Sequence, residues 1–207
     1  MFICQTWLLR SGKTMTECVG LMIAKRESSR LPGKNTLDFM GAPLFEWNLN
    51  KILSTGIKVY FDSDSEELLL QSEKLGAIPH LRPDHLLGHD IPSIPIFQQL
   101  YDDFSINSAS LLNIQANSPN VSIDLIDKAI YILKNLHCDE LLTIYPSLKI
   151  NGSLWGFSSD RLLNYGDPYV HKPDVLLTDK SIDVHTIEEY NIAHSIENSR
   201  DLSQSNN

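Results

Sequence analysis

Short apolar runs alternate with amphipathic stretches along most of the chain. The apolar runs predict buried strands at 19–23, 58–61, 78–81, 111–114, 141–144, 154–157 and 175–177. Apolar positions spaced three or four residues apart predict helices between them, which begin at Pro43, Ser65, Ser93, Ser122 and about Ile187. Strands that alternate with helices are typical of a three-layer α/β domain around a mainly parallel sheet.

The pattern predicts a single domain over residues 15–197, because it shows no internal repeat and no linker. Residues 1–14 have no clear period and precede Met15, so they are either a short added strand or a segment upstream of the natural start. Residues 198–207 are polar and lack apolar anchors, which predicts a disordered tail.

Composition narrows the class of protein. The chain has 207 residues, 42% of them hydrophobic, and a net charge of -9. An acidic chain is a poor general nucleic-acid binder, although a local cluster of cations can still hold a phosphate ligand. No apolar run approaches the roughly 18 residues of a membrane span, and no secretory signal is evident. Three widely spaced cysteines suit neither a disulfide framework nor a zinc site, so we expect a cytoplasmic protein without a membrane partner.

The most informative segment runs from Ala24 to Asn35, directly after the first predicted strand. It holds four cations, namely Lys25, Arg26, Arg30 and Lys34. A triphosphate needs cations and backbone N–H donors, and a loop after a strand supplies both. Pro32 stiffens the turn, and Gly33 allows the backbone to approach a ligand closely. A solvated basic loop is the alternative, but the ordered string after a buried strand favours phosphate binding.

Ligands of parallel sheets bind at the carboxyl ends of the strands, so we expect the loops after Ile23, Phe61 and Ile114 to face one cleft. Gln115 ends one of these strands, where it bonds either loop backbone or a substrate. Asp183 and His185 are two residues apart and point the same way in an extended chain.

The string Arg30-Leu-Pro-Gly-Lys-Asn35 resembles the signature of the sugar-acid cytidylyltransferases. These are the acylneuraminate cytidylyltransferases, or CMP-sialic acid synthetases, and relatives that act on pseudaminic, legionaminic and 3-deoxy-manno-octulosonic acids. Further segments are similar in the same order: Gly41-Ala-Pro-Leu44 with Trp47, Ser63-Asp-Ser-Glu-Glu67, Leu81-Arg-Pro83 with Asp90 and Ser93, Leu112 to Pro119, and Asp183-Val-His-Thr186 with Glu189. Together they span about residues 19–195 and imply a Rossmann-like nucleotide-diphospho-sugar transferase fold.

The resemblance also implies an activity and a role for each matching residue. CTP and an acidic sugar would be the partners, with Lys25 and Lys34 on the triphosphate and Gln115 on the sugar. The nucleotide-binding residues would be Ala24, Ser28, Arg30, Asn35, Arg82 and Ser93. Asp183 would hold Mg²⁺. The family has a second aspartate where His185 stands, so His185 contacts phosphate, binds the metal through water, or favours Mn²⁺.

Several alternatives stay open at this point. Arg82 could be a solvated surface residue, Ser93 a helix cap, and Asp64 a cap or a cleft residue. Thr186 and Glu189 form a capping box, and the histidines other than His185 are interpreted as ordinary loop or surface residues. The cations available for a sugar carboxylate are Lys149, Arg161 and Lys172. A homodimer, another nucleotide or acceptor, and a non-catalytic nucleotide-binding protein remain compatible with the sequence.

Overall fold

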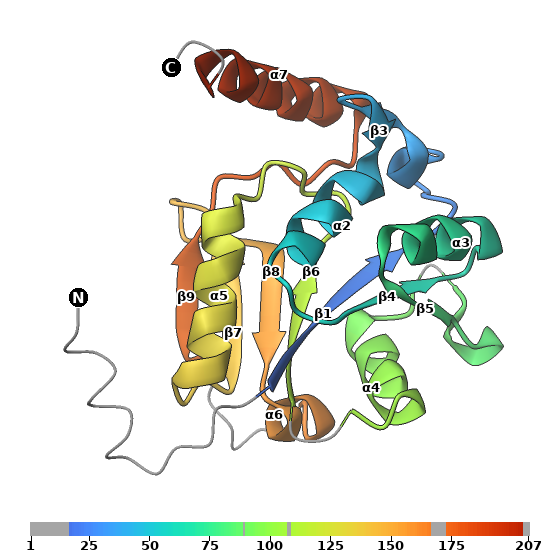
Figure 1. The fold of residues 1–207 in the computed structure, drawn as a ribbon, viewed down its shortest axis with the longest axis vertical. Helices are drawn as coiled ribbons and strands as arrows, with labels where there is room; N and C mark the ends of the chain where they lie inside the picture. Colours follow the sequence, from blue (N-terminus) through green and yellow to red (C-terminus); the bar gives the residue numbers. More distant parts are fainter. Residues whose placement is uncertain (1–16, 89, 107–108, 167–172, 205–207) are drawn as a thin grey trace.

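A seven-stranded, mostly parallel sheet organises the part of the chain that the computed structural model describes, which is residues 17–88, 90–106, 109–166 and 173–204 (Figure 1). The strand order is β5-β4-β1-β6-β8-β7-β9. Neighbouring strands are parallel except β8, which is antiparallel to both β6 and β7. This confirms the predicted fold class, whereas the predicted extension at 1–14 lies outside the described residues.

The predicted strands and helices all form, with small shifts at their ends. The strands are β1 (Glu17–Ala24), β2 (Asp38–Phe39), β3 (Ala42–Pro43), β4 (Val59–Ser63), β5 (Ile78–Leu81), β6 (Ala109–Ile114), β7 (Glu140–Ile144), β8 (Ile150–Phe157) and β9 (Val175–Thr178). The helices are α2 (Leu44–Ser54), α3 (Glu66–Leu75), α4 (Ser93–Asp103), α5 (Ile123–Asn135), α6 (Ser159–Leu163) and α7 (Ile187–Gln204), with 3-10 turns at Lys34–Thr36 and Asp84–Leu86.

Apolar side chains on both faces of the sheet create the three layers. Helices α2, α3 and α5 cover one face, where their side chains pack against residues such as Met22 and Phe61. Helices α4 and α6 cover the other face around Leu21 and Phe157. Because β1 and β6 are buried on both faces, their sequences are mostly apolar and do not alternate between apolar and polar residues.

Helix α7 crosses one end of the domain, above α2 and the β2–β3 hairpin (Figure 1). Phe39, Leu44, Val184 and Ala193 form a fully buried cluster beneath it. The helix continues to Gln204, so the predicted disordered tail at 198–207 is wrong for residues 198–204. Arg200 explains part of the difference, because its guanidinium donates to the Asn120 carbonyl and to Glu197.

Strand β5 contributes a buried charged cluster that the sequence pattern did not reveal. The ring of His80 contacts Asp62 through Nδ1 (2.8 Å) and Asp103 through Nε2 (2.9 Å), and only 7% of the residue is exposed. The interpretation of His80 as an ordinary loop or surface residue is therefore wrong. Burial opposes protonation of the ring, but the bonds to Asp62 and Asp103 outweigh it and raise the pKa of His80.

We predict that His80→Gln destabilises the protein most at low pH. A histidine whose folded pKa is raised contributes stability that is complete below its unfolded value of 6.5 and is lost as pH rises through the folded value. Urea unfolding should show a loss of about 2 kcal/mol at pH 5.5 and a smaller loss at pH 9. The exposed His137→Gln should show neither effect, and a pH-independent loss in His80→Gln would contradict the prediction.

Candidate active site

A polar cavity of about 200 Å³ lies at the carboxyl ends of β1 and β6. Its lining residues come from the end of β1, from the loop that follows it, and from one residue after β6: Ile23, Lys25, Glu27, Ser28, Ser29, Arg30, Lys34, Asn35 and Asn117. Five residues that the sequence singles out, Lys25, Ser28, Arg30, Lys34 and Asn35, are thus brought together. Ala24 is the buried last residue of β1, directly before the loop.

Internal hydrogen bonds shape the loop between Lys25 and Asn35. The buried Asn35 amide donates to the Lys25 carbonyl (2.7 Å), which joins the two ends of the loop. Ser28 accepts from the Leu31 amide (3.5 Å), and Gly33 has a φ of 62° at the start of the 3-10 turn. The Arg26 amide donates to Asp64 (2.8 Å), so Asp64 braces this loop, while Ser65 caps α3.

The segment before α7 lies against this loop. Lys34 Nζ donates to the Val184 carbonyl (3.2 Å) and lies 3.4 Å from His185 Nδ1. His185 Nε2 lies 2.8 Å from Asp183 Oδ2 and 3.2 Å from Arg30 Nη2. The loop at residues 24–35, here called the phosphate loop, and Asp183 therefore lie on one side of the molecule, and Asp183 and His185 point the same way.

These neighbours assign a tautomer to His185. Arginine and lysine can only donate, and an ionised carboxylate can only accept. The shorter contact fits Nε2–H donating to Asp183, which leaves Nδ1 to accept from Lys34. In this arrangement both ring nitrogens of His185 are engaged by protein groups.

Asn117 is a site residue to which the sequence pattern assigned no role. It lines the cavity, and its side-chain amide donates to Asp183 Oδ1 and to the Val184 carbonyl (3.1 Å). The Val184 amide donates back to the Asn117 carbonyl (2.8 Å). Its place three residues after the end of β6 is the signal that could have identified it.

The two lysines that face the cavity have altered acidities. Burial lowers the pKa of Lys34 to about 8, although Asp183 opposes this shift. Burial, followed by repulsion from Arg82, also lowers the pKa of Lys25. Lys25 Nζ donates to the Gly88 carbonyl. Each ammonium is thus held by a backbone carbonyl that a phosphate oxygen can replace.

Asp183 and His185 lie beside the loop without lining the cavity, and three more residues implied by the resemblance, Arg82, Ser93 and Gln115, do not line it either. Arg82 is 2% exposed and pairs with Asp62 through Nε (2.7 Å) and Nη2, so it is not a solvated surface residue. Ser93 is the exposed first residue of α4. It makes no capping bond, because Pro92 and not Ser93 occupies the N-cap position of the helix. Gln115 is half-buried, accepts from the Ser118 hydroxyl (3.4 Å) and lies next to Gly152 of β8.

The donors near Asp183 suit a metal that arrives with a nucleotide. Within the described ranges, no group of three or more His, Cys, Asp or Glu side chains is arranged to hold a metal ion. Mg²⁺ bound with phosphates commonly uses one or two carboxylates plus phosphate oxygens and water. A single carboxylate beside a cation-rich loop fits that donor set.

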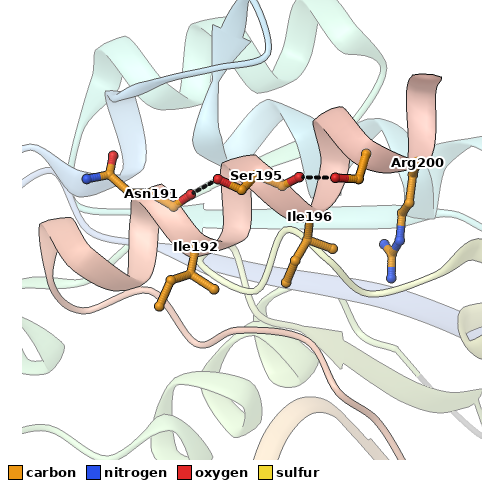
Figure 2. A pocket seen from close by; sticks show the side chains of 6 residues that line it. Asn191, Ile192, Ser195, Ile196 and Arg200 are labelled. Carbon is orange, nitrogen blue, oxygen red and sulfur yellow. Dashed lines mark hydrogen bonds between the residues drawn. The ribbon is translucent and has the colours of Figure 1, made fainter. Parts of the chain in front are cut away.

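A larger hollow of about 660 Å³ lies along α7, where its residues Asn191, Ile192, Ser195, Ile196, Ser199 and Arg200 form the lining (Figure 2). Among the described residues that line it, Arg200 is the charged one, and it bonds Glu197 and the Asn120 carbonyl. Charged groups for phosphate chemistry are therefore concentrated in the smaller cavity. Among the described residues, no helix combines the length and apolarity that crossing a membrane requires.

The three cations considered for a sugar carboxylate differ in position. Arg161 pairs with Glu140 (2.8 Å) at the amino end of β7, so it lies at the opposite end of the strands from the cavity. This overturns Arg161 as an acceptor ligand at this site. Lys149 lies in the hairpin after β7, at the same end of the strands as the cavity. Lys172 lies outside the described residues.

The fold and the cation-rich loop define a class of protein, the nucleotide-diphospho-sugar transferase fold. The chain superposes on a CMP:2-keto-3-deoxy-manno-octonic acid synthetase complexed with CTP, with a TM-score of 0.70, 13% identity, and coverage of 89% of this chain and 100% of that one. It also superposes on Rv0371c from Mycobacterium tuberculosis H37Rv in complex with manganese, with a TM-score of 0.64, 13% identity, and coverage of 87% and 99%. At these identities the likeness concerns the fold alone.

The sequence places the chain within a family. The cytidylyltransferase family profile matches residues 19–192, so the chain belongs to that family. It is 38% identical over 72 residues to a pseudaminic acid cytidylyltransferase of Campylobacter jejuni subsp. jejuni serotype O:2, across 34% of this chain and 31% of that protein. It is 27% identical over 138 residues to a 3-deoxy-manno-octulosonate cytidylyltransferase of Colwellia psychrerythraea, across 66% and 48%. The chain therefore spans less than half the length of these two relatives.

We predict that Glu189→Ala weakens the start of α7. Glu189 accepts from the amides of His185 (2.7 Å) and Thr186 (2.9 Å), and Thr186 returns a bond to the Glu189 amide (3.2 Å). Losing this capping box should cost about 1 kcal/mol, measured by urea unfolding. The neighbouring, exposed Glu188→Ala should cost much less, and equal losses in both variants would refute the assignment.

Proposed function

We propose that the chain transfers CMP from CTP to an acidic sugar of the nonulosonate or 3-deoxy-manno-octulosonate type. The observation that carries this proposal is the contact between the phosphate loop, whose Lys25 and Lys34 line the cavity, and the segment 183–185, which carries the Asp183 carboxylate. Membership of the cytidylyltransferase family supports CTP as the donor. The names of the two relatives, which act on pseudaminic acid and 3-deoxy-manno-octulosonate, support an acidic sugar as the acceptor.

In the proposed reaction, the anomeric hydroxyl oxygen of the sugar attacks the α-phosphorus of CTP in line with the leaving group. A bond forms between that oxygen and phosphorus, the bond from the α-phosphorus to the bridging oxygen breaks, and pyrophosphate leaves. The hydroxyl proton passes to solvent. Catalysis rests on positioning and on neutralising the charge of the departing pyrophosphate.

Lys25 and Lys34 would contact the triphosphate, which replaces the carbonyls of Gly88 and Val184 as their acceptors. Arg30 lies beside His185 and would add a third cation. Asn35 would act by joining the ends of the loop, because its amide is already bonded to Lys25. Lys25 and Lys34 are half-buried, and at such positions charge stabilisation is stronger than in bulk water.

Asp183 would hold a divalent ion together with the triphosphate. The ion, Mg²⁺ or Mn²⁺, supplies a positive charge that polarises phosphoryl oxygens. Asn117 and His185 hold the two carboxylate oxygens of Asp183 in place. His185 would link the carboxylate to Lys34 and so couple metal and phosphate binding.

We predict that Lys34→Ala lowers kcat/KM for CTP by about 100-fold, because one preorganised cation on the leaving group is lost. Pyrophosphate release should be followed with CTP, Mg²⁺ or Mn²⁺, and pseudaminic acid or 3-deoxy-manno-octulosonic acid. Lys128→Ala, on the exposed face of α5, is the control and should keep full activity. Full activity in Lys34→Ala would remove Lys34 from the mechanism. CTP binding in calorimetry with no turnover by the unaltered protein would favour a non-catalytic nucleotide-binding protein.

We predict that Asp183→Asn uncouples the metal from the nucleotide. Calorimetry without metal should give the same CTP affinity as the unaltered protein, to within about twofold, since Asp183 bonds the ion and not the phosphates. The gain in CTP affinity on adding Mn²⁺ should disappear together with turnover. Asp124→Asn, on the surface of α5, should retain both. A Mn²⁺ effect that survives in Asp183→Asn would place the metal elsewhere.

A further inference from the structure

The loop at residues 115–121 links β6 to α5 and determines where Asn117 lies. Asn117 contacts Asp183 at the candidate site, and Gln115 begins the same loop. The loop has few backbone bonds of its own, such as Val121 N to Ser118 O (3.3 Å). Its position therefore depends on side chains that reach it from neighbouring elements.

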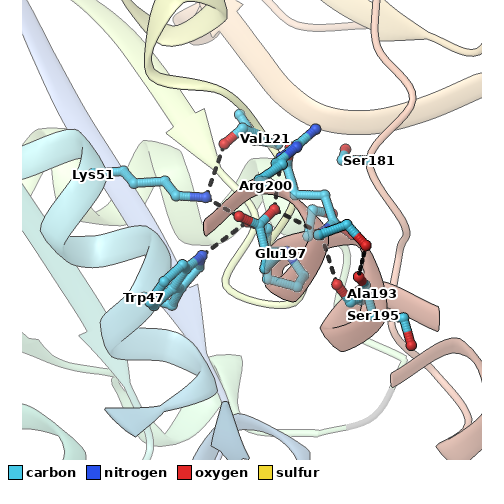
Figure 3. Close-up of polar contacts among 12 residues, drawn as sticks. Trp47, Lys51, Val121, Ser181, Ala193, Ser195, Glu197 and Arg200 are labelled. Atoms are coloured by element: carbon cyan, nitrogen blue, oxygen red, sulfur yellow. Dashed lines mark hydrogen bonds and ion pairs between the residues drawn. The ribbon is translucent and has the colours of Figure 1, made fainter. Parts of the chain in front are cut away.

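Helix α2 holds one side of the 115–121 loop. Asn48 donates to the carbonyls of Gln115 (2.8 Å) and Ser118 (2.9 Å). Trp47 and Lys51 both donate to the Pro119 carbonyl, and Lys51 also donates to Val121 (2.9 Å), as Figure 3 shows. These contacts orient the two ends of the loop.

Helix α7 holds the opposite side through Asn120. The Asn120 amide donates to the Ala193 carbonyl (3.0 Å) and to Glu197 Oε1 (2.8 Å). Arg200 Nη1 donates to the Asn120 carbonyl (3.0 Å) and to the same Glu197 oxygen (2.6 Å). Figure 3 shows Glu197 and Arg200 reaching from α7 toward Lys51 and Trp47 of α2.

Glu197 is a buried carboxylate outside the candidate site. The residue is 6% exposed, and burying a carboxylate is costly unless it is paired and hydrogen-bonded. Apolar packing also docks α7, because Ala193 of the helix is buried with Phe39, Leu44 and Val184. The buried Glu197 carboxylate accepts from both Asn120 and Arg200, so it contributes to fixing the position of Asn120.

We propose that Glu197 is a positioning residue, which holds Asn120 and thereby keeps Asn117 against Asp183. This inference rests on the proposed cytidylyl transfer for its kinetic consequence. Glu197 lies beyond residue 192, where the match to the family ends, so the site is completed by a part of α7 outside the matched region. Glu197 bonds Asn120, Asn117 bonds Asp183 and lines the cavity, and the two asparagines belong to the same 115–121 loop.

The test compares Glu197→Ala with Glu197→Gln, which keeps an oxygen that accepts from Asn120 and Arg200. With CTP and 3-deoxy-manno-octulosonic or pseudaminic acid, Glu197→Ala should lower kcat about tenfold, because a small displacement of the site slows chemistry. KM for CTP should change less than about twofold, since the lysines of the phosphate loop are untouched. Glu197→Gln should recover most of kcat, and Ser199→Ala on the same helix is the control.

Hydrogen exchange tests the same inference without turnover. The Val184 amide, which donates to the Asn117 carbonyl, should exchange faster in Glu197→Ala and at the original rate in Glu197→Gln and Ser199→Ala. Unchanged Val184 exchange in Glu197→Ala would overturn the proposal, as would faster exchange that glutamine fails to correct. If the unaltered protein turns over no acidic sugar, the proposed function fails, and Val184 exchange alone decides the role of Glu197.

Discussion

The candidate site depends on one contact between segments about 150 residues apart, in which Lys34 meets the Val184 carbonyl and the His185 ring. A half-buried ammonium is costly unless acceptors surround it, which is why burial lowers its pKa. Asp183 opposes that shift and is itself held by Asn117 and His185. The acceptors around the Lys34 ammonium thus link three segments of the chain, which are the phosphate loop, the end of β6 and the start of α7.

Local patterns predicted the elements well because strands and helices here bury their own apolar residues. The caps at Ser65 and Ser122 were also predictable, since a capping bond lies within one turn of its residue. The convergence of Lys25 to Asn35 with Asp183 followed from motif order and from the geometry of parallel sheets. These inferences use either a short stretch of chain or a general rule of the fold.

The remaining features depend on pairing between distant segments. The contact of His80 with Asp62 arises because β5 and β4 pair in the register that sets these residues side by side. The spacing of apolar residues along one strand does not reveal the register in which that strand pairs with its neighbour. In the same way, residues 198–204 carry no apolar stripe, so the pattern indicated disorder, whereas Arg200 finds its partners on a loop near residue 120.

The reversed direction of β8 brings a separate segment of the chain to the carboxyl end of β6. Because β8 is antiparallel to β6 and β7, its first residues lie at the carboxyl end of β6, where Gln115 begins its loop. The hairpin that delivers them exposes Leu148 by 78% and Ile150 by 68%. Neither residue bonds the phosphate loop in the described structure, so this hairpin can vary in sequence without altering the hydrogen bonds that shape that loop.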